Sequence, residues 1–309
     1  MAARATRSAS RKAASSSSSD GDDSRCLLLA LSHDELGVIF DGLADPLQPV
    51  VAVALSSTCL GLRTPLRAAL QVLKERHERA NALCLKFGLS CAAMRVARVL
   101  RGSGLALTAD DMATLAMILR TNGLTRMQKL YFHGNAVGDA GTLALCDGLG
   151  RGAAPLLTEL VLNSNSNQLK VGPVGAEALA AALRRGAWPR LEGLDLGGNP
   201  LGSQGVSALA APLRKRPALR CLVLNNCEIG DEGVASLFAN LGKEDFKALH
   251  TFWLEGNKIT DVGMATLAAA IEAGGLPTWE WHTHALHRNP ASAVAVHAVK
   301  DALAKRSSQ

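Results

Sequence analysis

The sequence is poor in aromatic residues and in long apolar runs, and these shortages limit the classes of protein to which it can belong. Only 4% of its 309 residues are aromatic, and Tyr131 is the one tyrosine. No apolar run approaches the roughly 18 residues that a membrane span requires, so we expect no membrane segment. Because 48% of the residues are hydrophobic and 19% are charged, the chain can still bury a sizeable core.

Paired cysteines and catalytic motifs are also missing. The seven cysteines are an odd number without paired spacing, which favours a reducing compartment over a disulfide framework. The chain has no phosphate-binding glycine loop with its lysine, no nucleophile elbow, and no helical histidine pair with a glutamate between. We therefore expect neither an enzyme nor a bound cofactor.

One histidine cluster, consisting of His282, His284 and His287, lies near the C-terminus in what should be the last strand. In a strand, His282 and His284 would point to the same side, as two metal ligands could. However, no firm fourth ligand is visible, and His284 occupies a core leucine position of a terminal unit. We therefore expect partly exposed histidines of a cap and no metal site.

The sequence does contain an internal repeat of about 30 residues. Each complete copy has apolar residues eight, five and three places before an asparagine, and one copy has cysteine in that landmark place. Successive landmarks lie 30, 34, 28, 30 and 32 residues apart. A degenerate copy, with Ser103 at the landmark, lies 32 residues before the first. The landmarks are Asn135, Asn165, Asn199, Cys227, Asn257 and Asn289.

The apolar period changes within each copy. Between residues 218 and 241, Leu222 and Leu224 have the spacing of a strand, whereas Val234, Leu237 and Leu241 have that of a helix face. Short strands that alternate with helices need crossover connections, which make the strands parallel. One such unit cannot bury its apolar face alone, so the units must stack.

The landmark residues and a recurring glycine have expected roles in that stack. The landmark asparagine should turn inward after the strand, because its amide can both donate to and accept from unpaired backbone groups. Cys227 is small, tolerates burial and can donate weakly, so it can replace asparagine. The glycines either let neighbouring helices approach closely or serve a turn. They are Gly141, Gly175, Gly205, Gly233 and Gly263.

These repeats resemble the ribonuclease-inhibitor-like leucine-rich repeats, the long class with a full α-helix in every unit. The resemblance covers roughly residues 95–305. It implies an α/β fold in the form of a right-handed solenoid, a horseshoe with a parallel sheet on the concave side and helices on the convex side. We assign residues 91–309 to this domain, with about seven repeats, of which the first is degenerate and the last a cap.

The N-terminus differs from the repeats. Residues 1–25 form a tail rich in serine and arginine, and its first 19 residues hold four basic residues and no acid, a disordered composition. Without those four the chain has 29 basic and 27 acidic residues, so the tail supplies most of the net charge of +6. We expect a cytoplasmic or nuclear protein, with an organellar transit peptide in residues 1–19 as the alternative.

Residues 26–90 should form a separate helical module. An apolar helical stripe follows Asp34, a turn bounded by proline comes next, and further helices run to about residue 87. The order of "DEL" at 34–36, "IF" at 39–40, "DPL" at 45–47 and "SSTC" ending at Cys59 resembles the F-box. That family docks onto an adaptor of cullin-based ubiquitin ligases. The implied docking residues are Leu36, Ile39, Phe40, Leu43 and Pro46. The alternative is a helical cap that only covers the end of the stack.

Residues six, four and two places before each landmark should project from the concave face, because strand side chains alternate. Exposed aromatics among mixed charges are typical of protein interfaces, although isolated surface aromatics are also common. Seven strands would span about 29 Å, which suits a protein epitope better than a small molecule. The mixed charge disfavours nucleic acid. The candidate partner-binding residues are Lys129, Tyr131, His133, Glu159, Asn163, Asp195, Val223, Asn225, Trp253 and Glu255; Val161, Gly193, Gly197, Cys221 and Ala285 should share their face.

Two irregularities are expected to be structural. The second full unit has about four extra residues between landmark and helix, which should form a loop at one rim. Pro212 lies inside a helical pattern and should shorten or kink that helix. The sequence as a whole predicts a monomeric, non-enzymatic interaction protein. Our leading hypothesis is a substrate-recognition subunit of a cullin-type ubiquitin ligase, and the alternative is a scaffold or inhibitor.

Overall fold

A computed structural model describes residues 31–57, 62, 64–121, 124–147, 149–150, 154–163, 170–238, 241–242, 244–280 and 284–306. The predicted tail, Cys59, Asn165, His282 and the inserted residues 164–169 lie outside the described residues. Within the described part of the chain, every helix is too short or too polar to span a bilayer.

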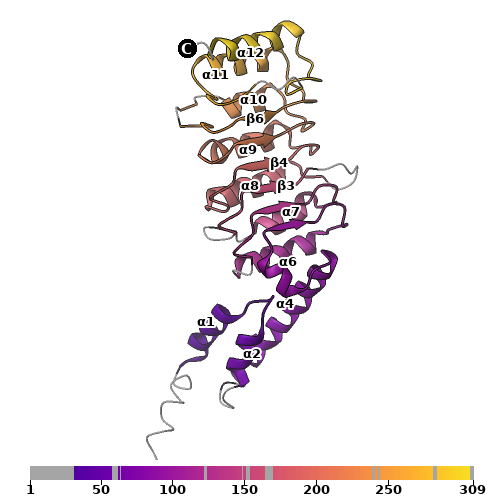
Figure 1. Ribbon diagram of the computed structural model, residues 1–309, viewed down its shortest axis with the longest axis vertical. Helices are drawn as coiled ribbons and strands as arrows, with labels where there is room; N and C mark the ends of the chain where they lie inside the picture. Colours follow the sequence, from indigo (N-terminus) through magenta and orange to yellow (C-terminus); the bar gives the residue numbers. More distant parts are fainter. Residues whose placement is uncertain are drawn as a thin grey trace, which may run out of the picture.

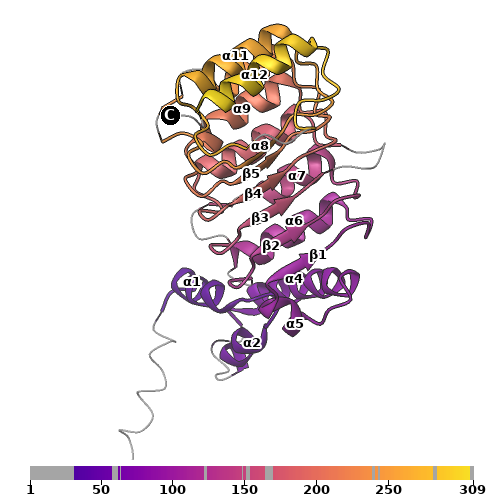
Figure 2. The same ribbon diagram turned by 45° about the horizontal axis from the view of Figure 1, so that its top comes forward.

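Six short strands form one parallel sheet in chain order. They are β1 (Val99–Arg101), β2 (Lys129–Tyr131), β3 (Glu159–Val161), β4 (Gly193–Asp195), β5 (Cys221–Val223) and β6 (Thr251–Trp253). Neighbouring strands pair residue by residue, so their middle side chains form a single buried row of five leucines ending at Phe252. The predicted α/β class with a parallel sheet is confirmed (Figures 1 and 2).

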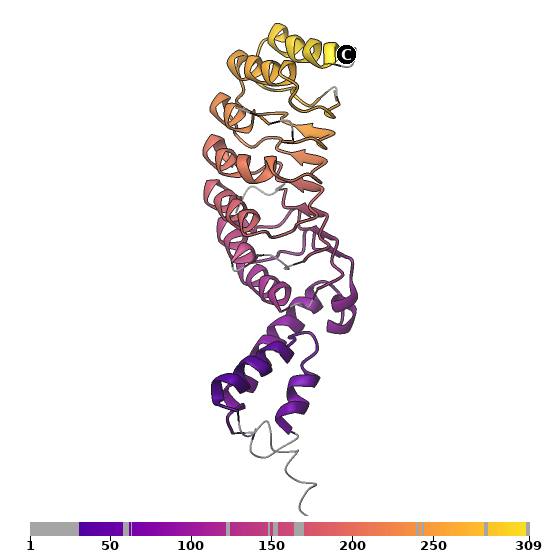
Figure 3. The ribbon, with the colours of Figure 1, turned by 90° about the vertical axis from the view of Figure 1, so that its left-hand side faces the viewer.

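A helix follows every strand and covers the same side of the sheet. These helices are α6 (Ala109–Arg120), α7 (Gly138–Cys146), α8 (Pro173–Arg184), α9 (Gly202–Arg214), α10 (Asp231–Phe238) and α11 (Asp261–Glu272), and α12 (Ala293–Arg306) packs against α11 at the C-terminal end. Figure 3 shows the helices along one side of the molecule and the strands along the other. The sheet surface opposite the helices carries no described helix, and we call it the open face.

Two of the recurring glycines decide between the two roles that the sequence left open. A Cβ atom on Gly205 would lie 3.0 Å from the Ala176 Cβ and 3.2 Å from the Pro173 Cα on the preceding helix. One on Gly233 would lie 3.2 Å from the Ser203 Cα. Neither glycine has a positive φ, so no turn requires it. These glycines therefore permit the close approach of consecutive helices.

The landmark asparagines form a ladder of buried hydrogen bonds between coils. Asn257 Oδ1 accepts from the backbone N–H groups of Cys227 and Ile229 at 2.9 and 3.1 Å. Its Nδ2 donates to the carbonyls of Leu224 and Leu254, each at 2.8 Å. Asn135, Asn199 and Asn289 likewise accept one backbone N–H and donate to two carbonyls within 3.0 Å, with a third carbonyl at 3.4 Å. Each landmark thereby pairs backbone groups of two coils that burial would otherwise leave unsatisfied.

Cys227 lies in the same place and keeps part of this bonding. Its Sγ donates toward the carbonyls of Leu196 and Asn225, each 3.3 Å away. Burial raises the pKa of this thiol to about 12, so it stays protonated and can act as the donor. Cys227 is therefore a structural residue of the ladder.

Two further ladders, which the sequence analysis missed, join the helices of successive coils. Carboxylates at the first turn of a helix accept backbone N–H groups before or within the next helix: Asp139 from Gly172 and Gly175, and Asp231 from Thr260 and Gly263. Arginines near helix C-termini donate to carbonyls of a neighbouring coil. Such contacts satisfy the groups that every helix leaves unpaired at its ends. The arginines are Arg185, Arg214, Arg216 and Arg306.

The N-terminal module comprises α1 (His33–Leu43), α2 (Val50–Ser57), α4 (Arg67–Lys86) and α5 (Cys91–Val96). Ser32 caps α1 through a capping box with Glu35. The module's buried residues fall into two groups. Leu36, Phe40 and Leu73 belong to a small core with Ala44, Ala52, Leu62 and Leu66. Ala80, Leu83 and Cys84, from the second half of α4, belong instead to the core of the repeats, together with Leu47 and Met94.

The register of the first repeat corrects one prediction. Val99 pairs with Lys129, so the position equivalent to Asn135 is residue 105 and not Ser103. That residue is Leu105, and a search for landmark asparagines could not find it because it is apolar. Ser103 instead aligns with His133, and its Oγ lies 2.8 Å from the His133 Nδ1.

Two further predictions, on the last repeat and on helix α9 with its Pro212, are also corrected. Residues 284–288 form a turn where a strand was predicted. Ala285 is buried and His284 is exposed, which is the reverse of the predicted burial of these two residues. Two backbone hydrogen bonds still join this turn to the segment that follows β6, donated by the N–H groups of Leu254 and Gly256. Helix α9 is not shortened, since it extends over 13 residues. Pro212 lies in its last turn and frees the carbonyl of Ala208, toward which Arg184 Nη2 donates at 3.4 Å.

Candidate functional site

The strands divide their side chains between the core and the open face. In β2, Leu130 is buried while Lys129 and Tyr131 are partly exposed, and β4, β5 and β6 repeat this pattern. In β3 the third residue, Val161, is buried as well, contrary to prediction, because it lies between longer neighbours. The ten candidate partner-binding residues are all partly or fully exposed: Lys129, Tyr131, His133, Glu159, Asn163, Asp195, Val223, Asn225, Trp253 and Glu255.

A polar cluster holds the side chains of β2 and β3 in place. Lys129 Nζ lies 2.8 Å from Glu159 Oε2, and Tyr131 donates its hydroxyl to the same oxygen at 2.9 Å. The hydrogen bond with Glu159 raises the pKa of Lys129, while burial and then the same carboxylate raise that of Tyr131. Arg101 approaches the Tyr131 ring at 5.8 Å. Tyr131 is thus a preorganised aromatic side chain on the open face.

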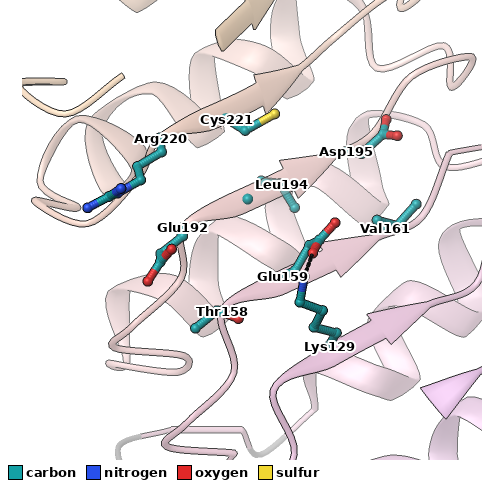
Figure 4. A pocket seen from close by; sticks show the side chains of 10 residues that line it. Lys129, Thr158, Glu159, Val161, Glu192, Leu194, Asp195, Arg220 and Cys221 are labelled. Atoms are coloured by element: carbon teal, nitrogen blue, oxygen red, sulfur yellow. Dashed lines mark ion pairs between the residues drawn. The ribbon is translucent and has the colours of Figure 1, made fainter. Parts of the chain in front are cut away.

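The centre of the open face is hollowed at β4. Gly193 and Gly197 leave Asp195 as the only side chain that β4 and the following turn project there, and a cavity of about 340 Å³ lies over the strand. Its walls come from β3 and β5, as Figure 4 shows for Glu159 and Cys221. The lining residues are Lys129, Thr158, Glu159, Val161, Glu192, Gly193, Leu194, Asp195, Arg220 and Cys221.

Sequence reasoning predicted a shallow face and did not find this hollow. The sequence did contain a signal for it. Gly193 and Gly197 lie six and two places before the landmark, where every other unit has at least one larger side chain. Thr158, Glu192 and Arg220 were also missed. They directly precede β3, β4 and β5, one residue before the first position that was predicted to face the open side. They line the edge of the hollow.

Asp195 is a partly buried carboxylate held by neutral donors. Its Oδ2 accepts from Asn163 Nδ2 at 2.8 Å, and its Oδ1 accepts from the Gly197 backbone N–H at 2.9 Å. Burial raises its pKa above the usual range of an aspartate. Among the described residues Asp195 forms no salt bridge. The buried amide oxygens of Asn163 and Asn225 likewise have no hydrogen-bond partner in the described part of the chain.

The C-terminal end of the open face is more open. Trp253 is partly exposed on β6, and Arg288 Nη1 lies 3.6 Å from Glu255 Oε1. His284 and His287 face each other with their Nδ1 atoms 3.1 Å apart. Within the described ranges, no group of three or more histidine, cysteine or acidic side chains could hold a metal ion, and His282 lies outside those ranges.

The predicted docking residues of the N-terminal module separate into two sets. Leu36 and Phe40 are 4% and 1% exposed and, like Pro46, are buried, so they cannot contact an adaptor while the module is folded. This corrects the prediction that the whole stripe docks. The reason is the helical period, which turns positions 36 and 40 toward α2 and α4. Ile39 and Leu43 are each 37% exposed, beside the more exposed Val38, Val50 and Val51.

Two copies of the repeat are recognised by comparison with protein families. The family model described as Leucine Rich repeat matches residues 191–210 and 217–238, which hold β4 with much of α9 and β5 with α10. The match supports a leucine-rich repeat protein, a type that generally binds other proteins and is not enzymatic. No curated protein matches the chain.

Proposed function

We propose that the protein is the substrate-recognition subunit of a cullin-type ubiquitin ligase, acting as a monomer in the cytoplasm or nucleus. In this proposal the repeats form a right-handed horseshoe of the ribonuclease-inhibitor-like kind, and its concave surface, the open face, binds a protein target. The leucine-rich repeat match supports the protein-binding part of the proposal. The F-box-like segment supports the ligase part.

The observation that carries the proposal is the separate core of the N-terminal module. A helical element that served only as a cap would share its buried residues with the first repeat. Here α1, α2 and the first half of α4 enclose their own core, while the second half of α4, together with Leu47 and with Met94 of α5, packs on the repeats. The module also exposes apolar side chains, Val38 and Val50 at 74% and 68%, which burial in a second partner would explain.

A scaffold or inhibitor is the second candidate, and the second half of α4 favours it. Leu83 and Cys84 join the repeat core, and Lys86 Nζ lies 2.6 Å from Asp111 Oδ2 on α6. This part of the module does cap the stack. In a scaffold, residues 31–66 would need only to help cover the stack, as Leu47 does in the repeat core.

Affinity purification with mass spectrometry separates the candidates. The full chain should recover both a cullin adaptor and a target protein. Ile39→Asp with Leu43→Asp should lose the adaptor and keep the target, because both side chains are exposed and leave the module core intact. Tyr131→Ala with Trp253→Ala should do the opposite. Val262→Asp, which places the same charge at an exposed apolar position in the first turn of α11, is the control.

Recovery of the same adaptor by the Ile39 and Leu43 variant would contradict the docking role. A target that remains bound to the Tyr131 and Trp253 variant would place its binding site away from the open face. If the full chain recovers a target and no adaptor, the scaffold or inhibitor replaces the ligase subunit.

A further inference from the structure

We infer that the hollow over β4 is a pocket for one arginine or lysine side chain of the target protein, with Asp195 as its counter-ion. This inference rests on the proposed function, since it names what the open face recognises. It is carried by the charge of the hollow, by its shape and by two unpaired acceptors beside it.

The carboxylate of Asp195 in the hollow forms no ion pair with any residue that the structure describes. Glu159 already pairs with Lys129 and accepts from Tyr131. Among the described residues, the donors to Asp195 are the Asn163 amide and the Gly197 N–H, both neutral. A partly buried carboxylate loses water without gaining a counter-charge, which is unfavourable. A positive group from a partner would remove that deficit, and it would form a charge-assisted hydrogen bond.

The shape of the hollow fits a long side chain with a charged end. The absence of a side chain at Gly193 opens the sheet surface, and Val161 and Cys221 provide apolar walls. In Figure 4, Asp195 lies at one end of the hollow, while Glu192 and Arg220 lie at the other. Lysine and arginine place a methylene stem on apolar surface and a cationic group beyond it. A volume of about 340 Å³ has room for either side chain.

Two buried acceptors strengthen the preference for a donor-rich group. The Oδ1 atoms of Asn163 and Asn225 have no hydrogen-bond partner among the described residues. The Nδ2 of Asn163 donates a hydrogen bond to Asp195. An ammonium group has three donors and a guanidinium has five, and neither has an acceptor. An anion beside Asp195 would instead face its carboxylate, which disfavours a phosphate or carboxylate ligand at this end of the hollow.

The test uses the full-length chain and a displayed library of random dodecapeptides. Peptides selected on the immobilised protein should share one arginine or lysine. Replacing that arginine with citrulline, or that lysine with norleucine, should weaken binding at least about tenfold in a fluorescence anisotropy titration. These peptide changes leave the protein untouched, so they cannot act through misfolding.

Three variants complete the test on the protein side. Asp195→Asn keeps the shape and removes the charge, and it should weaken binding at least about tenfold. Gly193→Leu should do the same by filling the hollow, and the backbone allows it because Gly193 has no positive φ. Glu232→Gln removes an exposed carboxylate in the first turn of α10 and should leave binding unchanged. Thermal melts should show that Asp195→Asn remains folded.

Selected peptides without a shared basic residue, or with unchanged affinity for Asp195→Asn, would overturn the inference. If those peptides still require Tyr131 and Trp253, the open face remains the binding surface and the proposed function stands. If they bind equally well to the Tyr131→Ala and Trp253→Ala variant, the proposed function fails with the inference.

Discussion

The repeats and the N-terminal module bury their apolar residues in different ways. Each repeat is held by a buried strand leucine, by a ladder of landmark side chains and by carboxylate or arginine contacts with the next coil. Among its described residues the module has a core of seven buried side chains, and it leaves Val38, Val50 and Val51 half or more exposed. The repeats therefore bury most of their apolar strand and helix residues in one continuous core, whereas the module leaves several large apolar side chains exposed.

Helix α4 contains the boundary between these two regions. Leu73 lies in the module core, and Ala80, seven residues later, lies in the repeat core. One helix thus contributes both to the core of the proposed docking module and to the core of the repeats. The two readings of residues 26–90 are compatible, and a deletion of the entire module would not distinguish them.

Two deletions that differ in α4 should show the largest contrast. Removing residues 1–90 takes away α4 and exposes the first repeat, so the melting temperature of the repeats should fall by about 10 °C or more, because several core side chains lose their cover. Removing residues 1–66 keeps α4 and should shift it by only a few degrees. Circular dichroism melts measure both. Equal melting temperatures for the two truncated chains would contradict a capping role for α4.

Phe40→Ala should be the most damaging single substitution in the module. Phe40 is buried in the small core, so its loss should lower the stability of the module by about 3–4 kcal/mol, enough to unfold it. The repeats should keep their transition, because their core does not include this residue. Chemical denaturation followed by hydrogen exchange separates the two regions. Ile39→Ala, one residue away and exposed, is the control and should change stability by at most about 0.5 kcal/mol.

Asn257→Ala and Asn289→Ala should show that the ladder matters most inside the stack. Asn257 is buried and makes four bonds to backbone groups, so its loss should cost about 3 kcal/mol. Asn289 is partly exposed in the terminal turn, where water can replace it, and its loss should cost about 1 kcal/mol. Urea denaturation measures both. A larger effect at Asn289 would contradict the ladder as described.

Asp111→Asn should have a smaller effect that depends on pH. Burial alone would raise the pKa of Asp111, but hydrogen bonds from Lys86 and Thr108 lower it below its ordinary value. Its ionised form therefore stabilises the fold above the unfolded-state pKa of about 3.9, and this contribution is lost as the pH falls through the lower folded-state pKa. The variant should be about 1–2 kcal/mol less stable at pH 7. The difference should shrink below about pH 4, and a constant difference down to pH 2 would contradict this cause.

The repeat pattern predicted the strand positions because a buried row needs leucine at a fixed place before the landmark. Asn135, Asn199 and Asn257 were likewise assigned correctly to the turn, since few side chains can both donate and accept there. The first and last repeats were misplaced because a terminal coil has a neighbour on one side only. Leu105 and Ala285 consequently escape the constraints that define the pattern.

The candidate site was less accessible to sequence reasoning. Alternation placed Tyr131 and Asp195 on the open face, but it gave no indication that Glu159 would bond both Lys129 and Tyr131. The hollow at Gly193 exists because side chains of the neighbouring strands do not fill the space above it. The sequence of one strand does not show this. Helical periodicity also grouped Phe40 with Ile39, although only packing against α2 and α4 decides which of the two is buried.

Hydroxyl-radical footprinting of the full chain, free and bound to the target that it recovers, tests the central claim most directly. If the uncovered surface of the stacked strands is the binding surface, oxidation of Tyr131, His133 and Trp253 should fall sharply on binding, while Val262 and Val294 on the helices should be unchanged. Protection of the helix residues, with the three strand-side residues oxidised as in the free protein, would contradict it.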